Sequence, residues 1–253
     1  MCTVVLLRRP DAAWPLIVAA NRDELVERPW RAPARHWPDR PEVVAGLDEL
    51  AGGSWLGLNE HGVVAAILNR RHSLGPAPDK RSRGELVLDA LDHADAAAAA
   101  EALAMLDGNA YRAFNMIVGD DRDAFWIRNP GDRSPGAVRV TPVPPGVSMI
   151  TAWDLNDTEA SDRTRLYLPR FRAAPPPDPA ADDWEAWAAL LDGRDRAAGA
   201  DDPNAAMHID TGWGFGTVSS SLIGIPARGT DTKPVWRFAA TIPQRGAYEP
   251  VDL

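Results

Sequence analysis

The chain has 253 residues, of which 45% are hydrophobic and 25% are charged, an ordinary composition for a globular protein with a substantial core. Its formal net charge of −9 argues against binding to nucleic acid or to an anionic membrane through bulk electrostatics. A single cysteine excludes an internal disulfide framework and a cysteine-based zinc site, and it fits a reducing compartment, so we expect a cytoplasmic protein. The first residues lack the order of a signal peptide, and no stretch approaches the ~20 apolar residues that span a bilayer.

The first 24 residues predict an antiparallel hairpin. Two apolar runs, residues 3–7 and 16–20, flank a turn-like segment that contains a proline. A turn centred near residues 11–12 brings Cys2 opposite roughly position 21. The polar tetrad Asn21-Arg22-Asp23-Glu24 is therefore expected to return to the side of the cysteine.

Cys2 directly follows Met1, and methionine before a small residue is commonly removed during synthesis. The mature chain would then begin with a thiol nucleophile and a free α-amine on adjacent atoms. The reference pKa of an α-amine is about 7.7–8.0, so part of it is unprotonated at neutral pH and acts as a base. The alternative is an inert, packed cysteine, because thiol reactivity depends on local pKa and access.

Residues 27–38 are rich in proline, arginine and tryptophan, which excludes a long regular element. Two interpretations stay open for this segment. It is either a surface loop that wraps the sheet or one wall of a substrate cleft, in which Trp30 and the arginines hold an apolar or anionic acyl group.

Residues 52–69 predict a second hairpin, with Gly62 at its turn. Its second strand is apolar throughout, which is typical of a strand buried on both faces. That strand ends at the polar cluster Asn69-Arg70-Arg71-His72. Such a cluster fits either a functional site or a strand end whose polar groups are satisfied by the protein.

The rest of the chain groups strands and helices into separate blocks. We expect helices within residues 82–107, 159–173 and 182–191, and strands at residues 114–119, 124–128, 137–141, 147–151, 217–225 and 235–241. This arrangement favours an α+β fold with largely antiparallel sheets. So much apolar strand needs cover on both faces, which two sheets between helix layers would provide.

Two local patterns in this part carry further predictions. Ser82 and Glu85 have the spacing of a capping box at a helix start. Three carboxylates in the turn at residues 120–123 lack the spacing of a calcium loop, so we interpret them as a solvated acidic turn and expect no metal.

Five motifs together resemble the NRDE family, also called the transport and Golgi organisation family. They are Met1-Cys2-Thr3, Ala20-Asn21-Arg22-Asp23-Glu24, Gly53-Ser54-Trp55-Leu56-Gly57, Asn59-x-x-Gly62 and Ser82-x-Gly84-x-Leu86. That family is in turn similar to the N-terminal-nucleophile hydrolases of the bile-salt hydrolase and penicillin acylase branch. The resemblance implies a four-layer αββα sandwich formed by a single domain over residues 1–253.

The resemblance also implies catalytic roles. Cys2 would be the nucleophile, its α-amine the general base, and Asp23 the acid that holds the amine. Asn69 would stabilise the tetrahedral oxyanion, a role worth about 3–4 kcal/mol. We also place Asn21 and Arg22 at this site.

Two departures from the hydrolase pattern stand out. The hydrolases carry an arginine where this chain has Ala20, and we expect Arg22 to lie on another face. Their second oxyanion asparagine falls near Ala152, where Asn156 is the candidate substitute.

Two functions of different classes follow. The first is a cysteine-dependent hydrolase of non-peptide amide or acyl bonds that needs no cofactor, with Trp30, Trp55, Arg70 and Asn156 binding a small-molecule substrate. The second is a non-catalytic haem or lipid/acyl-CoA binding and trafficking protein on the same scaffold, since the family is linked to those ligands. The residues support haem weakly, through Cys2 and five scattered histidines without an attachment motif.

Overall fold

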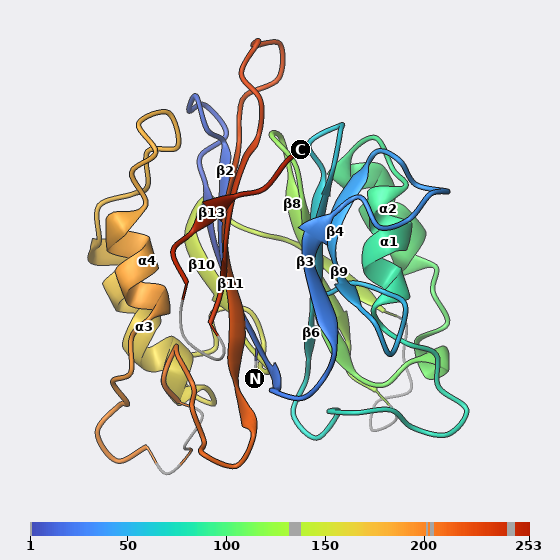
Figure 1. The fold of residues 1–253 in the computed structure, drawn as a ribbon, viewed down its shortest axis with the longest axis vertical. Helices are drawn as coiled ribbons and strands as arrows, with labels where there is room; N and C mark the ends of the chain where they lie inside the picture. Colours follow the sequence, from blue (N-terminus) through green and yellow to red (C-terminus); the bar gives the residue numbers. More distant parts are fainter. Residues whose placement is uncertain (1, 132–137, 201, 203–204, 242–245) are drawn as a thin grey trace. The chain divides into compact units, whose positions relative to one another are not determined.

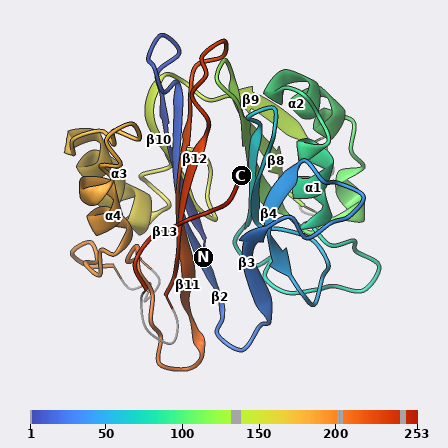
Figure 2. The same ribbon diagram turned by 45° about the horizontal axis from the view of Figure 1, so that its top comes forward.

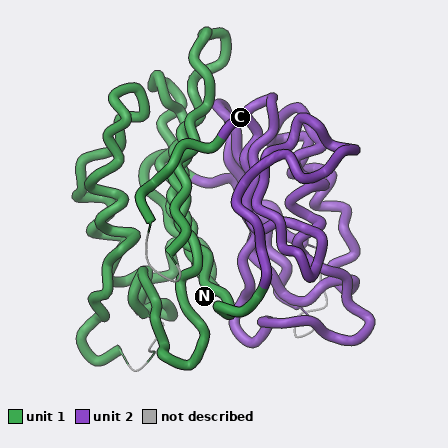
Figure 3. Tube along the Cα trace, viewed as in Figure 1, with its two compact units in different colours: residues 1–28, 144–251 green, residues 29–143, 252–253 purple. Residues whose placement is uncertain are grey.

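The computed structural model describes residues 2–131, 138–200, 202, 205–241 and 246–253. They form two compact units, shown in different colours in Figure 3. Unit 1 comprises Met1–Arg28 and Pro144–Val251, and unit 2 comprises Pro29–Val143 with Asp252–Leu253. The chain thus leaves unit 1 after its first hairpin and returns to it later. That residues 1–253 act as one domain stays a prediction.

Unit 1 contains a six-stranded antiparallel sheet with the strand order β10-β1-β2-β11-β12-β13. Its strands are β1 (Thr3–Arg8), β2 (Leu16–Leu25), β10 (Gly146–Ile150), β11 (Phe215–Ile225), β12 (Val235–Ala240) and β13 (Glu249–Pro250). The predicted first hairpin is confirmed, and β2 continues through the whole polar tetrad. The predicted last hairpin is confirmed as β11 and β12.

The helices of unit 1 are α3 (Asp162–Ala173) and α4 (Glu185–Leu191), and both lie over one face of this sheet (Figure 1). Side chains alternate between the faces of a strand. Val5, Ile17 and Ala19 share a core with Phe171 and Trp187 of the helices, so odd-numbered positions of β1 and β2 face the helices. Even-numbered positions of these strands face the other way.

Unit 2 contains a seven-stranded antiparallel sheet with the order β3-β4-β5-β6-β7-β8-β9. Its strands are β3 (Trp30–Ala34), β4 (Val43–Asp48), β5 (Leu56–Asn59), β6 (Val64–Asn69), β7 (Phe114–Gly119), β8 (Ala124–Asn129) and β9 (Arg139–Pro142). The predicted hairpins β5–β6 and β7–β8 are confirmed. The proline-rich segment forms the short strand β3, which tolerates Pro33 because it lies at the sheet edge.

The predicted strands 137–141 and 147–151 correspond to β9 and β10, which follow each other in sequence but belong to different sheets. Residue 137 lies outside the described residues. The crossing between the units falls between these two strands, at Val143 and Pro144.

The helices of unit 2 are α1 (Glu85–Leu91), α2 (Ala96–Ala104) and the short 3₁₀ helix η1 (Gly108–Ala110). Figures 1 and 2 show α1 and α2 over one face of the unit 2 sheet. The predicted capping box is wrong. The N-cap of α1 is Gly84, and the Ser82 hydroxyl instead accepts a hydrogen bond from the Gly84 N–H at 3.3 Å.

The solvated acidic turn is also wrong for its first residue. Asp120 is only 3% exposed, and its carboxylate accepts hydrogen bonds from the backbone N–H groups of Ala96, Arg122 and Asp123. Because Ala96 begins α2, Asp120 satisfies a helix N-terminus from a neighbouring turn.

The glycines of two family motifs serve packing. A Cβ placed on Gly53 would lie 2.4 Å from the Gly84 carbonyl carbon, and the Ser54 N–H donates to the Gly84 oxygen at 3.0 Å. A Cβ on Gly46 would lie 2.3 Å from the ring of Trp55. The motifs around residues 53–57 and 82–86 therefore meet at a backbone contact that admits no side chain.

Two antiparallel sheets, each with helices over one face, confirm the α+β prediction. Each unit contains one sheet and one helix layer. Within the described ranges, none of the helices is long and apolar enough to cross a membrane.

Candidate functional site

The register of β1 and β2 decides which tetrad residue accompanies Cys2. Thr3 pairs with Asn21, so extending the antiparallel register by one step sets Cys2 opposite Arg22. The prediction placed the cysteine opposite roughly position 21, one residue away. A one-residue shift moves side chains to the other face of a sheet. Arg22 therefore shares the face of Cys2, whereas Asn21 and Asp23 lie on the helix side.

Arg22 also shares its face with Ala20, because residues two apart in a strand point the same way. The expectation that Arg22 lies on another face is therefore wrong. Arg22 is 5% exposed and pairs with Ser219 of β11. A row of Cys2, Arg22 and Ser219 thus crosses three adjacent strands on the face that the helices do not cover.

The Cys2 thiol is half-buried and donates to the backbone oxygen of Asp23, with Sγ and O 3.6 Å apart. Burial raises the pKa of the Cys2 thiol above its ordinary value, and the negative charge of Asp23 raises it further. The α-amine of the unprocessed chain, the bond to the Asp23 oxygen and the charge of Arg22 lower this pKa by smaller amounts. The resting thiol is therefore protonated at neutral pH and needs a base to become a nucleophile.

Asp23 lies at the centre of a buried polar network. Its Oδ2 accepts a hydrogen bond from Nη1 of Arg163 at 3.1 Å, and its Oδ1 accepts one from the Thr217 hydroxyl at 2.6 Å. The same Nη1 donates to the Thr3 hydroxyl at 2.5 Å. Sequence reasoning missed Arg163 and Thr217, since no local signal links Asp23 to residues 140 and 194 positions away.

Asn21 is fully engaged in holding unit 1 together. Its Nδ2 donates to the backbone oxygens of Leu191 at 2.8 Å and Met207 at 3.0 Å, while its Oδ1 accepts from the Ser220 hydroxyl at 2.6 Å. These contacts tie β2 to the end of α4 and to β11. A role for Asn21 in acyl chemistry stays a prediction, and the geometry favours a structural role.

The side chain of Asn156 forms hydrogen bonds with the edge strand β10. Its Oδ1 accepts from the Met149 N–H at 2.8 Å, and its Nδ2 donates to the Ser148 hydroxyl at 3.1 Å. The residue adopts a left-handed conformation with φ of 58°, which asparagine tolerates better than most residues. Its predicted contact with substrate stays a prediction, and the neighbouring Ala152 is buried.

The remaining polar candidates belong to unit 2. Asn69 ends β6 half-buried and pairs with Phe114, whose ring packs into the helix-side core. Within the described part of the chain, the Asn69 side chain makes no hydrogen bond. Arg70 donates from Nη1 to Oδ1 of Asn115 at 2.7 Å, and Asn115 is completely buried. The oxyanion role of Asn69 and the substrate role of Arg70 stay predictions.

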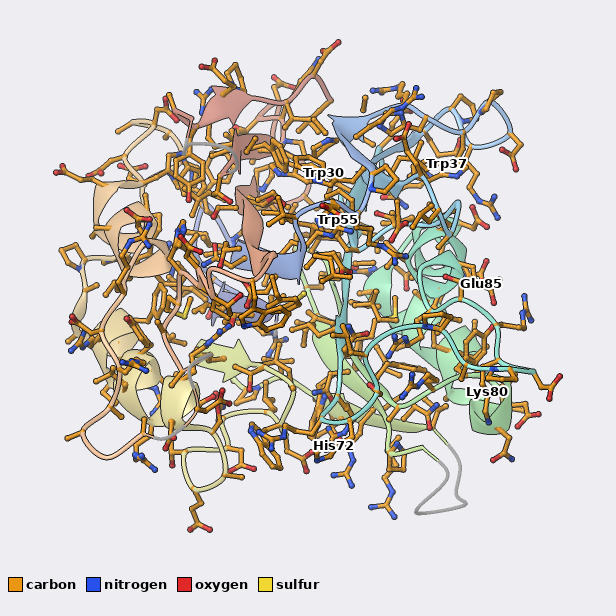
Figure 4. The ribbon with its side chains drawn as sticks, turned by 60° about the horizontal axis from the view of Figure 1, so that its bottom comes forward. Trp30, Trp37, Trp55, His72, Lys80 and Glu85 are labelled. Carbon is orange, nitrogen blue, oxygen red and sulfur yellow. The ribbon has the colours of Figure 1, made fainter. Side chains whose placement is uncertain are left out.

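Trp30 and Trp55 are neighbours in unit 2, and both are labelled in Figure 4. Their ring centroids lie 5.8 Å apart at an interplanar angle of 89°, an edge-to-face contact. Both residues are half-buried. Their predicted contact with substrate stays a prediction.

Comparison with known proteins places the chain in a family. The model of the family described as "Transport and Golgi organisation 2" matches residues 1–158, which is more than half of the chain. The chain belongs to the Transport and Golgi organisation 2 family. The family recognised from the five motifs is thereby confirmed.

The homologues of this family from mouse (Mus musculus) and human (Homo sapiens) are 38% and 39% identical to the chain, over 113 and 114 residues. Each match covers 43% of this chain and 40% of the relative. The matched part of the chain thus spans well under half the length of these Transport and Golgi organisation 2 homologues.

Solved structures show the same fold at low identity. An N-acylethanolamine-hydrolysing acid amidase orthologue from Caenorhabditis elegans is 14% identical, with 88% of this chain and 92% of that chain covered and a TM-score of 0.57. Penicillin V acylase from Agrobacterium tumefaciens is 14% identical, with coverages of 96% and 84% and a TM-score of 0.53. A variant of conjugated bile acid hydrolase from Clostridium perfringens is 12% identical, with coverages of 99% and 92% and a TM-score of 0.57. The N-terminal-nucleophile hydrolase-like fold is therefore confirmed for this family member.

Proposed function

We propose that the chain is a cysteine-dependent hydrolase of non-peptide amide or acyl bonds that acts through Cys2 after removal of Met1. The observation that carries this proposal is the meeting of three groups at the start of β1 and the end of β2. The Cys2 thiol bonds to the Asp23 backbone, and the buried Arg22 shares its face of the sheet.

The chemistry requires a base because the resting thiol is protonated. In the proposed reaction, the α-amine of Cys2 takes the thiol proton while Sγ attacks the carbonyl carbon of the substrate. The carbonyl oxygen becomes an oxyanion, and its collapse breaks the bond to the leaving group, which receives the proton from the α-ammonium. The product of this step is a thioester on Cys2.

Water completes the cycle. The α-amine takes a proton from water, whose oxygen attacks the thioester carbonyl, and collapse releases a carboxylic acid and returns the proton to the thiol. The positive charge of Arg22 favours the thiolate, and the same charge would favour a developing oxyanion on this face.

The names of the structural neighbours suggest which substrates to test. They are an amidase that hydrolyses N-acylethanolamines, a penicillin V acylase and a conjugated bile acid hydrolase. We therefore propose a small-molecule substrate with an apolar acyl part joined through an amide, thioester or lactone.

A substrate panel tests the proposal. Hydrolysis of acyl amides, lactones and acyl thioesters is measured with the processed protein and with Cys2→Ala, and Arg165→Gln on exposed surface serves as a matched control. We expect at least one class to be hydrolysed and Cys2→Ala to reduce its rate by about 100-fold or more. Equal rates in the two proteins, or no hydrolysis of any class, would contradict the proposal.

The second candidate is the non-catalytic binding of haem or of a lipid or acyl-CoA. The observation that favours a non-catalytic function is the raised pKa of Cys2, since a protonated thiol is inert at rest. The same shift favours a lipid or acyl-CoA over haem held by Cys2, because a metal binds the thiolate. Spectral titration with haem separates the two functions. A specific absorption band that is lost in Cys2→Ala supports haem ligation, and the absence of any such band counts against it.

A further inference from the structure

Arg163 occupies a costly position. It lies in the first turn of α3 and is only 3% exposed. Burying an unpaired charge costs several kcal/mol, and the positive end of the helix dipole disfavours a cation in the first turn. A cation retained in such a place is expected to have a specific anionic partner.

Asp23 is that partner, and Arg163 contacts two residues that adjoin the Cys2 thiol. The guanidinium donates to Oδ2 of Asp23, whose backbone oxygen accepts the Cys2 thiol. It also donates to the hydroxyl of Thr3, the residue that follows Cys2. One side chain of α3 therefore fixes both strands of the first hairpin beside the thiol.

We propose that Arg163 is a positioning residue, which pairs with the buried carboxylate of Asp23 and holds the start of β1 so that Cys2 faces Arg22. The inference rests on the proposed function only in calling Cys2 the nucleophile. The resemblance to the hydrolases leads one to expect an arginine at position 20. Here, Arg22 and Arg163 approach the Cys2–Asp23 contact from the two faces of the sheet instead.

The charged groups near Cys2 in unit 1 can be named strand by strand. Arg22, Asp23 and, near the strand end, Glu24 come from β2, and Arg163 comes from α3. Once Met1 is removed, Cys2 also carries the α-amine. The strands β10 and β11, which flank this hairpin, contain no charged residue. Removing the Arg163 charge would leave Asp23 uncompensated beside the thiol, so the thiolate would form less readily.

The pH dependence of Cys2 alkylation tests this directly, because Cys2 is the only cysteine and intact mass reports its modification. We expect Arg163→Gln to raise the alkylation midpoint by about half a pH unit or more. Arg163→Lys, which keeps the charge, should keep the midpoint close to the wild-type value. Arg165→Gln, an exposed arginine on the same helix, should leave the midpoint unchanged.

A second background separates positioning from folding. Arg163→Gln is repeated together with Asp23→Asn, which removes both charges and avoids an unpaired buried ion. We expect a clearly smaller shift in this background, because the effect of Arg163 passes through the Asp23 charge. A folded Arg163→Gln with the wild-type midpoint, or equal shifts in both backgrounds, would overturn the inference. This experiment measures alkylation and not hydrolysis. If the proposed function fails but the inference holds, the alkylation midpoints shift as expected while the substrate panel shows no hydrolysis.

Discussion

The hydroxyl of Thr217 on β11 donates to Oδ1 of Asp23 on β2 at a distance of 2.6 Å, in a completely buried part of unit 1. The same hydroxyl oxygen accepts a hydrogen bond from the Ile209 N–H at 2.9 Å. Thr217 therefore connects the candidate acid to the segment that precedes β11. The carboxylate accepts hydrogen bonds from a hydroxyl of β11 and a guanidinium of α3, both distant from Asp23 in sequence.

Replacing Thr217 with valine keeps the shape of the side chain but removes both of these hydrogen bonds. We expect the free energy of unfolding to fall by about 1–3 kcal/mol, because a buried carboxylate and a buried N–H each lose a partner. Urea unfolding measures the change. The matched control is Thr230→Val, whose hydroxyl is exposed and bonds to the Ala227 oxygen, and it should stay within about 0.5 kcal/mol. Equal effects of the two substitutions would show that the Asp23 network contributes nothing to stability.

Asn21→Ala should lower the stability of the protein without changing the reactivity of Cys2. The substitution leaves two backbone oxygens and the Ser220 hydroxyl without the Asn21 amide, so we expect the free energy of unfolding to fall by about 3 kcal/mol. The alkylation rate of Cys2 at 25 °C should change by less than about twofold, because the amide lies on the other face of the sheet. Asn109→Ala on the exposed surface is the control for stability. A stable Asn21→Ala protein with a strongly altered thiol would assign the amide to the site instead.

Arg22→Met tests the row of residues on the Cys2 face. The thiolate is the reactive form, and the pKa of Cys2 is already raised, so alkylation speeds up as the pH rises above the ordinary thiol range. Arg22 lowers this pKa, and its removal should therefore shift the midpoint to still higher pH. Near pH 7.5 we expect alkylation to slow by about 3- to 10-fold, since one pKa unit is tenfold in thiolate. Arg31→Met, in an exposed ion pair with Glu49, is the control, and a midpoint that moves down would contradict the assignment.

Gly53→Ala tests the packing role of the glycine motif. The new Cβ would lie 2.4 Å from the backbone of Gly84, which cannot move aside like a side chain, so we expect a loss of about 2 kcal/mol or more. Gly52→Ala is the informative comparison. Its Cβ would meet no atom within 4 Å, and only its φ of 70° opposes the substitution, at about 1 kcal/mol. The midpoint temperature of thermal unfolding should therefore be lower for Gly53→Ala than for Gly52→Ala.

The hairpins could be predicted because each pairs two apolar runs across a short polar turn, as at residues 3–20 and 56–69. The strand β3 could not be predicted, because its proline and arginine residues are atypical of strands. An edge strand tolerates them since it pairs with a neighbour on one side only. The capping box at Ser82 failed for a tertiary reason. The chain there is fixed by the contact between Gly53 and Gly84, which no local pattern reveals.

The candidate site was predictable in part. Cys2 and the tetrad do meet, as the hairpin and the resemblance indicate. A shift of one residue in the β1–β2 register moves each tetrad side chain to the other face of the sheet. The sequence does not define the centre of the turn to within one residue. Arg163 and Thr217 reach Asp23 only through tertiary structure, so the sequence could not assign them.

The most direct test of the central claim is the intact mass of the purified protein after a brief reaction with a p-nitrophenyl acyl ester. We expect a species without Met1 that gains one acyl group and loses it again with time, and we expect no acylated species in Cys2→Ala. Retention of Met1, or the same acyl mass on Cys2→Ala, would contradict the claim that Cys2 and its α-amine carry out the chemistry.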